Sequence, residues 1–148
     1  MTRAELLAFM RSHRYAVEAS VSPTGGVEAA VVGIVVTDDF EIFFDTLAET
    51  RKARNLRRNA AIAFVIGGTA PQDERSVQYE GVADQPEGAE LERLKAVYLH
   101  RFPDGVERQS WPGLIYLRAQ PSWVRYSDFN RAPPEIVELD ARQLRAMS

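Results

Sequence analysis

The arrangement of apolar and polar residues predicts a chain built mainly from short strands. In several segments apolar residues alternate with polar ones or run together, and turn residues such as Gly, Pro and Asp separate these segments. The predicted strands are residues 15–21, 27–36, 41–44, 60–66, 75–83, 113–119 and 122–127, with 135–139 as a candidate edge strand in the C-terminal tail 131–148.

Three helices are expected among these strands. Thr2 and Glu5 form a capping box at the start of the first helix. The second helix follows Thr50, and the third begins near Pro86 and ends at Pro103. Six or more short strands with hairpin spacing and three intervening helices favour a mainly β (α+β) fold, a closed antiparallel barrel with helices at its ends.

Composition narrows the class of protein further. The 148 residues are expected to form one domain, 1–148, and the absence of cysteine excludes disulfides, thiol nucleophiles and thiolate-bound metals. His13 and His100 show no metal-ligand spacing, so no metal site is predicted and both are interpreted as structural or surface residues. Without a long apolar run or a secretory signal, we expect a cytoplasmic protein that has no membrane partner.

The helix that follows Thr50 has an unusual charge at its start. Thr50 is a favourable N-cap, yet Arg51 and Lys52 occupy the first turn, where the helix dipole favours acidic side chains. An anion bound to the free N–H groups and to these two cations would make the arrangement favourable. We therefore predict a phosphate-binding site at Thr50, Arg51 and Lys52.

The remaining residues of this helix divide into two faces. Ala53, Leu56 and Ala60 lie on one face and should pack inward, whereas Arg54 and Arg58 lie on the opposite face and are interpreted as solvated charges. The whole chain has a formal net charge of −3. A basic helix on an acidic protein favours a small anionic ligand over nucleic acid.

The sequence around this helix resembles the flavin-binding split-barrel family typified by pyridoxamine 5′-phosphate oxidase. The resemblance covers roughly residues 5–130, and its most specific part consists of Phe44, Asp45, Thr46, Thr50, Arg51, Lys52, Leu56 and Asn59. It implies a six-stranded split barrel that binds FMN, with the ribityl chain and phosphate held by the segment from Asp45 to Lys52. It also implies that the main chain of Val31, Val32 and Gly33 lies along the flavin, and that Trp123 belongs to a C-terminal strand that comes from the partner subunit and covers the flavin.

Four positions depart from the pattern of the vitamin B6 oxidases. Ala30 replaces an arginine that contacts the phosphate of FMN, and Ser76 replaces a glutamine that approaches the flavin. Val35 replaces a lysine and Ser127 replaces a histidine, and both of the replaced residues contact the substrate. These replacements predict that the chain does not oxidise pyridoxamine phosphate.

The sequence is compatible with three functions. The first is an FMN-dependent oxidoreductase with a small-molecule substrate that the sequence does not identify. The second is a deazaflavin-dependent reductase, whose cofactor would use Arg54 and Arg58 for its acidic tail. The third is a non-catalytic flavin-binding or sensing protein. Plain hydride transfer needs no general base, and no catalytic residue is assigned. The resemblance further implies a homodimer with a site at the interface of the two subunits.

Overall fold

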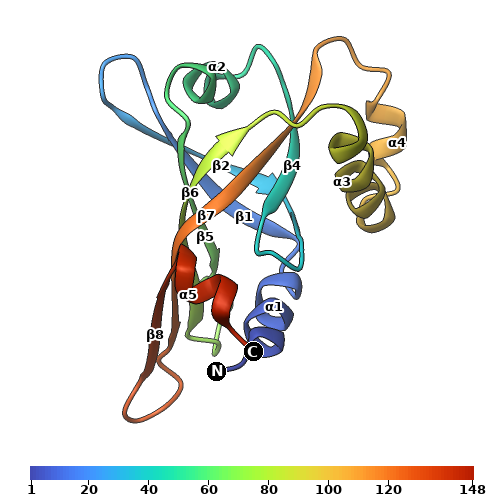
Figure 1. Ribbon diagram of the computed structural model, residues 1–148. Helices are drawn as coiled ribbons and strands as arrows, with labels where there is room; N and C mark the ends of the chain where they lie inside the picture. The colour runs from blue at the N-terminus through green and yellow to red at the C-terminus, as the bar shows by residue number, and fades with distance from the viewer.

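The computed structural model describes residues 1–148 and shows a curled antiparallel sheet flanked by helices (Figure 1). Its elements are α1 (Arg3–Arg11), β1 (Tyr15–Val21), β2 (Val27–Gly33), β3 (Val35–Val36), β4 (Ile42–Leu47), α2 (Arg51–Arg58), β5 (Ala61–Gly67), β6 (Arg75–Asp84), α3 (Gly88–Arg101), α4 (Gly105–Arg108), β7 (Leu114–Asp128), β8 (Glu135–Asp140) and α5 (Ala141–Ala146). The predicted split barrel is confirmed, and no helix is long and apolar enough to cross a bilayer.

The sheet runs in the order β2-β1-β5-β6-β7-β4-β3, and β8 pairs with β7. The sheet therefore has eight strands, more than the six that the family resemblance implied. The predicted strand 27–36 divides at Ile34 into β2 and β3, which lie at the two ends of the sheet order. The predicted strands 113–119 and 122–127 instead form the single strand β7. One extra residue at the corner is absorbed by a bulge, where the register shifts between Glu80 and Gly81 of β6.

Alternation along the strands separates the interior of the barrel from its outer side. On β4, Ile42 and Phe44 point into the main core with Phe64 and Tyr79, while Phe43 points outward beneath α3. The outward cluster also contains aromatic residues from α3 and β7, and Tyr116 stacks on Phe43 with ring centroids 5.4 Å apart. Two apolar layers therefore fix β4 from both sides, which determines where its polar residues point.

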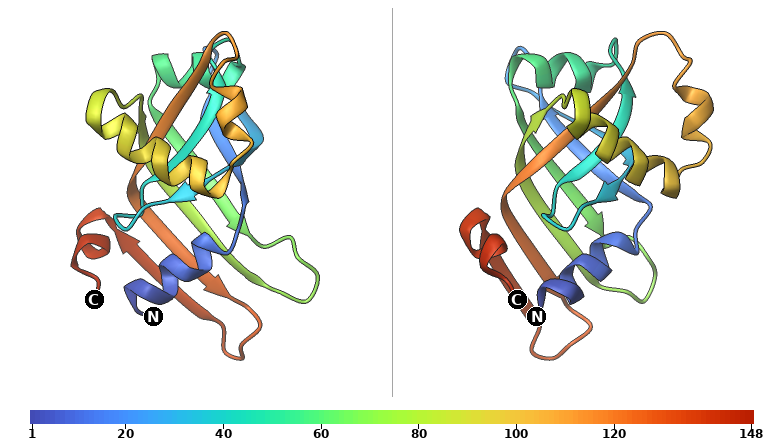
Figure 2. Two further views of the ribbon diagram at one scale, coloured as in Figure 1. Left: turned by 90° about the vertical axis from the view of Figure 1, so that its right-hand side faces the viewer. Right: turned by 45° about the vertical axis from the view of Figure 1, so that its right-hand side comes forward.

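The helices cover the ends and one side of the barrel. Two further views show α1 and α5 near one end of the barrel, α2 at the other end, and α3 with α4 along one side of it (Figure 2). The capping box of Thr2 and Glu5 is confirmed at α1. The helix predicted to start near Pro86 is confirmed as α3, which begins two residues later at Gly88 because β6 continues to Asp84. Asp84 forms an ion pair with Arg118 of β7 at 2.5 Å, which holds the end of β6 in the sheet.

The tail contains more structure than one edge strand. The predicted strand 135–139 is confirmed as β8, which pairs with β7 from Trp123 to Asp128. It continues into α5, a helix that was not expected in the tail. Asp140 and Gln143 form a capping box at the start of α5, and the buried Leu144 attaches the helix to the main core.

Candidate functional site

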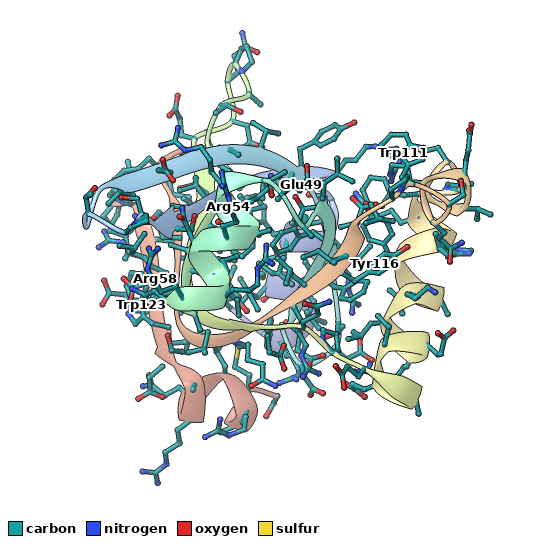
Figure 3. All side chains as sticks on the ribbon, turned by 90° about the horizontal axis from the view of Figure 1, so that it is seen from above. Glu49, Arg54, Arg58, Trp111, Tyr116 and Trp123 are labelled. Carbon is teal, nitrogen blue, oxygen red and sulfur yellow. The ribbon has the colours of Figure 1, made fainter.

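The predicted phosphate residues lie at the end of the barrel that α2 covers (Figure 3). Thr50 is the N-cap of α2 and accepts a hydrogen bond from the amide of Ala53 at 3.3 Å. Ala53 and Leu56 are buried, as the helix periodicity predicted, and Arg54 and Arg58 are exposed. The N terminus of α2 therefore faces the mouth of the barrel with Arg51 and Lys52 beside it.

A pocket of about 390 Å³ opens between this helix end and the strands β1 and β2. It brings together the three predicted phosphate residues and a set of side chains from the strands. Its walls are formed by Thr50, Arg51 and Lys52 on one side, with Glu18, Ser20, Glu28 and Ala30 on the other. The hydroxyl of Thr46 lies 3.1 Å from that of Thr50, so Thr46 adjoins the same corner.

Two carboxylates in this pocket were not predicted from the sequence. Glu28 forms an ion pair with Arg51, and its Oε1 accepts a hydrogen bond from Nδ2 of the buried Asn55 at 2.7 Å. The same amide group donates to the hydroxyl of Ser20 at 3.1 Å. Arg51 is therefore already paired, whereas Lys52 has no carboxylate within 4.0 Å.

Glu18 differs from Glu28 because its carboxyl group has no hydrogen-bond partner. The residue is 0% exposed, and neither Oε1 nor Oε2 is bonded. Burial raises the pKa of Glu18 to about 7, an increase that the nearby Lys52 and Ser20 partly offset. One sequence signal indicated this side chain, because Glu18 falls between Ala16 and Ser20 on the inward-facing positions of strand 15–21.

Asp45 does not reach this pocket, although it was predicted to contact the cofactor. Asp45 and Thr46 are consecutive on β4 and point to opposite sides of the sheet. Asp45 accepts a hydrogen bond from Nε of Arg108 at 3.0 Å, and both side chains are largely buried. The pair fastens α4 to the barrel, and Arg108 also bonds Asp104 at 2.5 Å.

The predicted flavin-lining residues of β2 face in different directions. Val32 is buried in the barrel core, whereas Val31 is 69% exposed on the outer face. Gly33 is covered by the ring of Phe102, which a Cβ at this position would approach to 3.0 Å. These side chains do not form one surface. The main chain of β2, however, pairs only with β1 and lies at an edge of the sheet.

Trp123 and the residues of the C-terminal strand lie elsewhere on the barrel. Trp123 is half-buried and pairs with Glu80 of β6 and Asp140 of β8. Figure 3 shows it toward the same side as Arg58, away from Trp111 and Tyr116. Trp123 does not line the pocket of its own chain at the N terminus of α2, and its placement over the flavin of a partner subunit stays a prediction.

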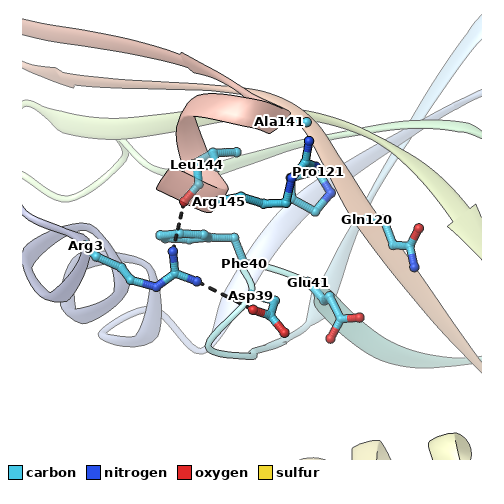
Figure 4. Close-up of a pocket in the computed structure, with 9 residues that line it drawn as sticks. All are labelled: Arg3, Asp39, Phe40, Glu41, Gln120, Pro121, Ala141, Leu144 and Arg145. Carbon is cyan, nitrogen blue, oxygen red and sulfur yellow. Dashed lines mark hydrogen bonds and ion pairs between the residues drawn. The ribbon is translucent and has the colours of Figure 1, made fainter. Parts of the chain in front are cut away.

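A second pocket of about 390 Å³ lies at the opposite end of the barrel, between α1, α5 and the turn before β4 (Figure 4). Arg3 donates a hydrogen bond to the carbonyl of Leu144 at 2.8 Å, and its guanidinium lies 4.8 Å from the ring centroid of Phe40. Arg3 also pairs with Asp39 at 3.6 Å. None of the residues predicted to bind cofactor lines this pocket. No cluster of three or more metal-ligating side chains occurs in the structure.

Comparisons with solved structures identify proteins that share the fold. A heme-binding protein from Mycobacterium smegmatis superposes with a TM-score of 0.83 at 17% identity, covering 99% of this chain and 61% of that protein. HutZ, a heme storage protein from Vibrio cholerae, gives 0.70 at 19% identity over 80% of this chain and 88% of its own. General Stress Protein 26 from Bacillus anthracis gives 0.69 at 17% identity, with coverage of 93% and 98%.

The chain thus spans about three fifths of the length of the Mycobacterium smegmatis protein. Among curated proteins, no significant match to the sequence was found. The family described as pyridoxamine 5′-phosphate oxidase matches residues 2–128, which is most of the chain. Together with the split barrel, this match shows that the chain belongs to the pyridoxamine 5′-phosphate oxidase family.

Proposed function

We propose that this protein binds FMN with its phosphate at the N terminus of α2, and that it is an FMN-dependent oxidoreductase acting on a small molecule. The observation that carries the proposal is the pocket between α2 and the barrel mouth. It combines the free N–H groups at the N terminus of α2 with the unpaired cation of Lys52, while the Thr50 hydroxyl donates to the carbonyl of Leu47 and caps the amide of Ala53. This combination is suited to a phosphate group.

The edge strand β2 supports the same placement of the cofactor. Because β2 pairs on one side only, main-chain groups near Val31 and Gly33 are available to the polar rim of an isoalloxazine ring. The flavin would supply the hydride chemistry, and the residues of the chain would bind and orient it. The substrate in this proposal is not pyridoxamine phosphate. The vitamin B6 oxidases bind the substrate phosphate at the position of Arg125 on β7. Here Arg125 donates hydrogen bonds to the hydroxyl of Ser127 at 3.4 Å and to the carboxylate of Glu138 at 3.1 Å.

A comparison of FMN with riboflavin, which lacks the phosphate, tests the site directly. We expect flavin fluorescence titrations to give tighter binding of FMN than of riboflavin. The double variant Arg51→Ala/Lys52→Ala should lose that preference, because charge-assisted phosphate contacts contribute roughly 1.5–3 kcal/mol each. The matched control is Arg54→Ala/Arg58→Ala on the outer face of α2. Equal loss in the control, or preferential binding of a deazaflavin, would count against the proposal. Oxidation of reduced nicotinamide by the loaded protein separates an oxidoreductase from a binding protein.

We also propose that two copies associate through the outer face of β2, β1 and β5. Every side chain that these strands direct outward is apolar, aromatic or glycine, and Val31, Val17 and Val65 form one row across the three strands. Such a face is unusual on a monomer, and a second copy would cover it beside the proposed flavin edge. Val17→Arg should convert a dimer to a monomer in light scattering, whereas Val106→Arg, an exposed valine on α4, should not. A monomeric parent protein would contradict this assembly.

Heme binding is a second candidate function, and one pocket favours it. The only two histidines, which are distant in sequence, line the same pocket of about 160 Å³ between α1 and α3. Arg11, Arg101 and an apolar strip from Ile34 to Val36 complete its walls, and these would suit propionates and a porphyrin edge. His100 is exposed, and His13 donates its Nδ1–H to the carbonyl of Phe9 at 2.9 Å, which leaves its Nε2 free, so both are proposed iron ligands. A hemin titration in which the double variant His13→Ala/His100→Ala leaves the Soret spectrum unchanged would reject this candidate.

A further inference from the structure

The α2 pocket contains one buried group that none of its neighbours satisfies. Glu28 is paired with Arg51 and Asn55, and the Ser20 hydroxyl accepts a hydrogen bond from Asn55, so only the O–H of Ser20 is left to partner Glu18, and it makes no hydrogen bond to either carboxyl oxygen. Glu18 lines the pocket, is fully buried, and leaves both carboxyl oxygens without a hydrogen bond. A buried polar group without a partner is costly, and a ligand that completes its bonding removes that cost.

The strand register places Glu18 at the side of the pocket that lacks a cation. Glu18 on β1 lies directly opposite Ala30 on β2, and Ala30 contributes no charge and little volume to the wall. Across the pocket lie Lys52 and the N terminus of α2, with Arg51 and Glu49 at the same helix end. Phe64, the partner of Glu18 on β5, adds no charge. An anion in this pocket would therefore lie between Lys52 and the carboxyl group of Glu18.

We infer that Glu18 binds the anionic group of the ligand as a neutral carboxylic acid, donating its O–H to an oxygen of that group. An ionised Glu18 would repel the anion strongly in a site shielded from water. A protonated Glu18 instead supplies a donor and removes the repulsion, as neutral carboxylic acids do in other buried oxyanion sites. The inference rests on the proposed phosphate site and adds Glu18 to its binding residues.

The physical environment supports this protonation state. Burial raises the pKa of Glu18 to about 7, so its proton is available near neutral pH. An anion beside the carboxyl group would raise the pKa further, because a like charge disfavours ionisation. Binding of a phosphate ester above pH 7 should consequently take up about one proton, and the affinity should fall by up to tenfold for each pH unit above that point.

Isothermal titration of FMN into the intact protein at pH 8, in buffers of different ionisation enthalpy, measures this proton directly. We expect uptake of about one proton by the parent protein. Glu18→Gln keeps an N–H donor but has no titratable proton, so it should bind FMN with no proton uptake and with an affinity that changes little between pH 7 and 9. Glu107→Gln, which replaces an exposed carboxylate on α4 away from the pocket, is the matched control, and it should retain both the uptake and the pH dependence.

The outcomes separate this inference from the proposed function. If FMN binds but the parent protein takes up no proton, Glu18 is not a donor to the phosphate, and the FMN site itself stands. If proton uptake persists in Glu18→Gln, the proton resides on the phosphate, whose second pKa is near 6, and the inference is refuted. If FMN does not bind, both proposals fail. Circular dichroism of the variants at the pH of each titration checks that they are folded.

Discussion

Replacement of Glu18 by glutamine should stabilise the fold in alkaline solution even without any ligand. In the folded protein the pKa of Glu18 rises to about 7 from the ordinary value of 4.5, because burial disfavours the charged form. Each unit of pKa corresponds to about 1.4 kcal/mol, so ionised Glu18 destabilises the fold by about 3 kcal/mol. The sign follows from proton binding. Between pH 4.5 and 7 the folded state holds the proton more tightly than the unfolded state, so stability decreases as pH rises.

Urea denaturation of the parent and of Glu18→Gln at several pH values from 4 to 8.5 measures this effect. The two free energies of unfolding should agree closely at pH 4, diverge as Glu18 ionises, and differ by about 3 kcal/mol at pH 8. Glu49→Gln, an exposed carboxylate at the same helix end, serves as the control and should show no such divergence. A difference between the parent and Glu18→Gln that does not vary with pH would refute the electrostatic explanation.

Three other substitutions test contacts that position the site, each by urea denaturation. Arg108→Ala should destabilise the fold by about 3 kcal/mol, because it leaves the largely buried Asp45 unpaired; a loss no larger than that of the exposed Arg58→Ala would contradict this. Gly81→Ala should lower the free energy of unfolding by about 2–3 kcal/mol, because the added Cβ would overlap the carbonyl oxygen of Gln120. Gly26→Ala, in an exposed turn, is the control and should lower it much less. Lys52→Ala should destabilise the parent at pH 8 but not Glu18→Gln, because Lys52 offsets the charge of Glu18; additive effects in the double variant would show that the two residues are not coupled.

Helix caps, helix faces and strands could be predicted from the sequence, because residues close together in the chain determine them. Thr50 caps α2 through its own side chain, and the helix period alone assigns Leu56 to the core and Arg58 to solvent. The strands were recognisable for the same reason, since alternation is a local property. The capping box of Asp140 and Gln143 was also readable in the sequence, although the tail was expected to contain only a strand.

Contacts between distant residues could not be predicted in the same way. Asp45 and Arg108 are 63 positions apart, and their pairing depends on where α4 packs. The environment of Glu18 depends on the register of β1 against β2 and on the position of α2, neither of which follows from the alternation of residues 15–21. The two strands predicted around Gln120 become one because the bulge opposite Gly81 accommodates the extra residue, a feature of the pairing partner.

Two parts of one edge of β7 pair with different strands. Its first part, from Leu114 to Ala119, pairs with β4, and its last part, from Trp123 to Asp128, pairs with β8, while β6 follows the opposite edge. Without β8, the backbone groups that β7 directs toward it between Trp123 and Asp128 would face solvent unpaired. Exposed edges of this kind recruit strands from other molecules. The segment from β8 to α5 therefore covers an edge that would otherwise favour aggregation. A protein shortened before Glu135 should form sheet-rich oligomers during folding.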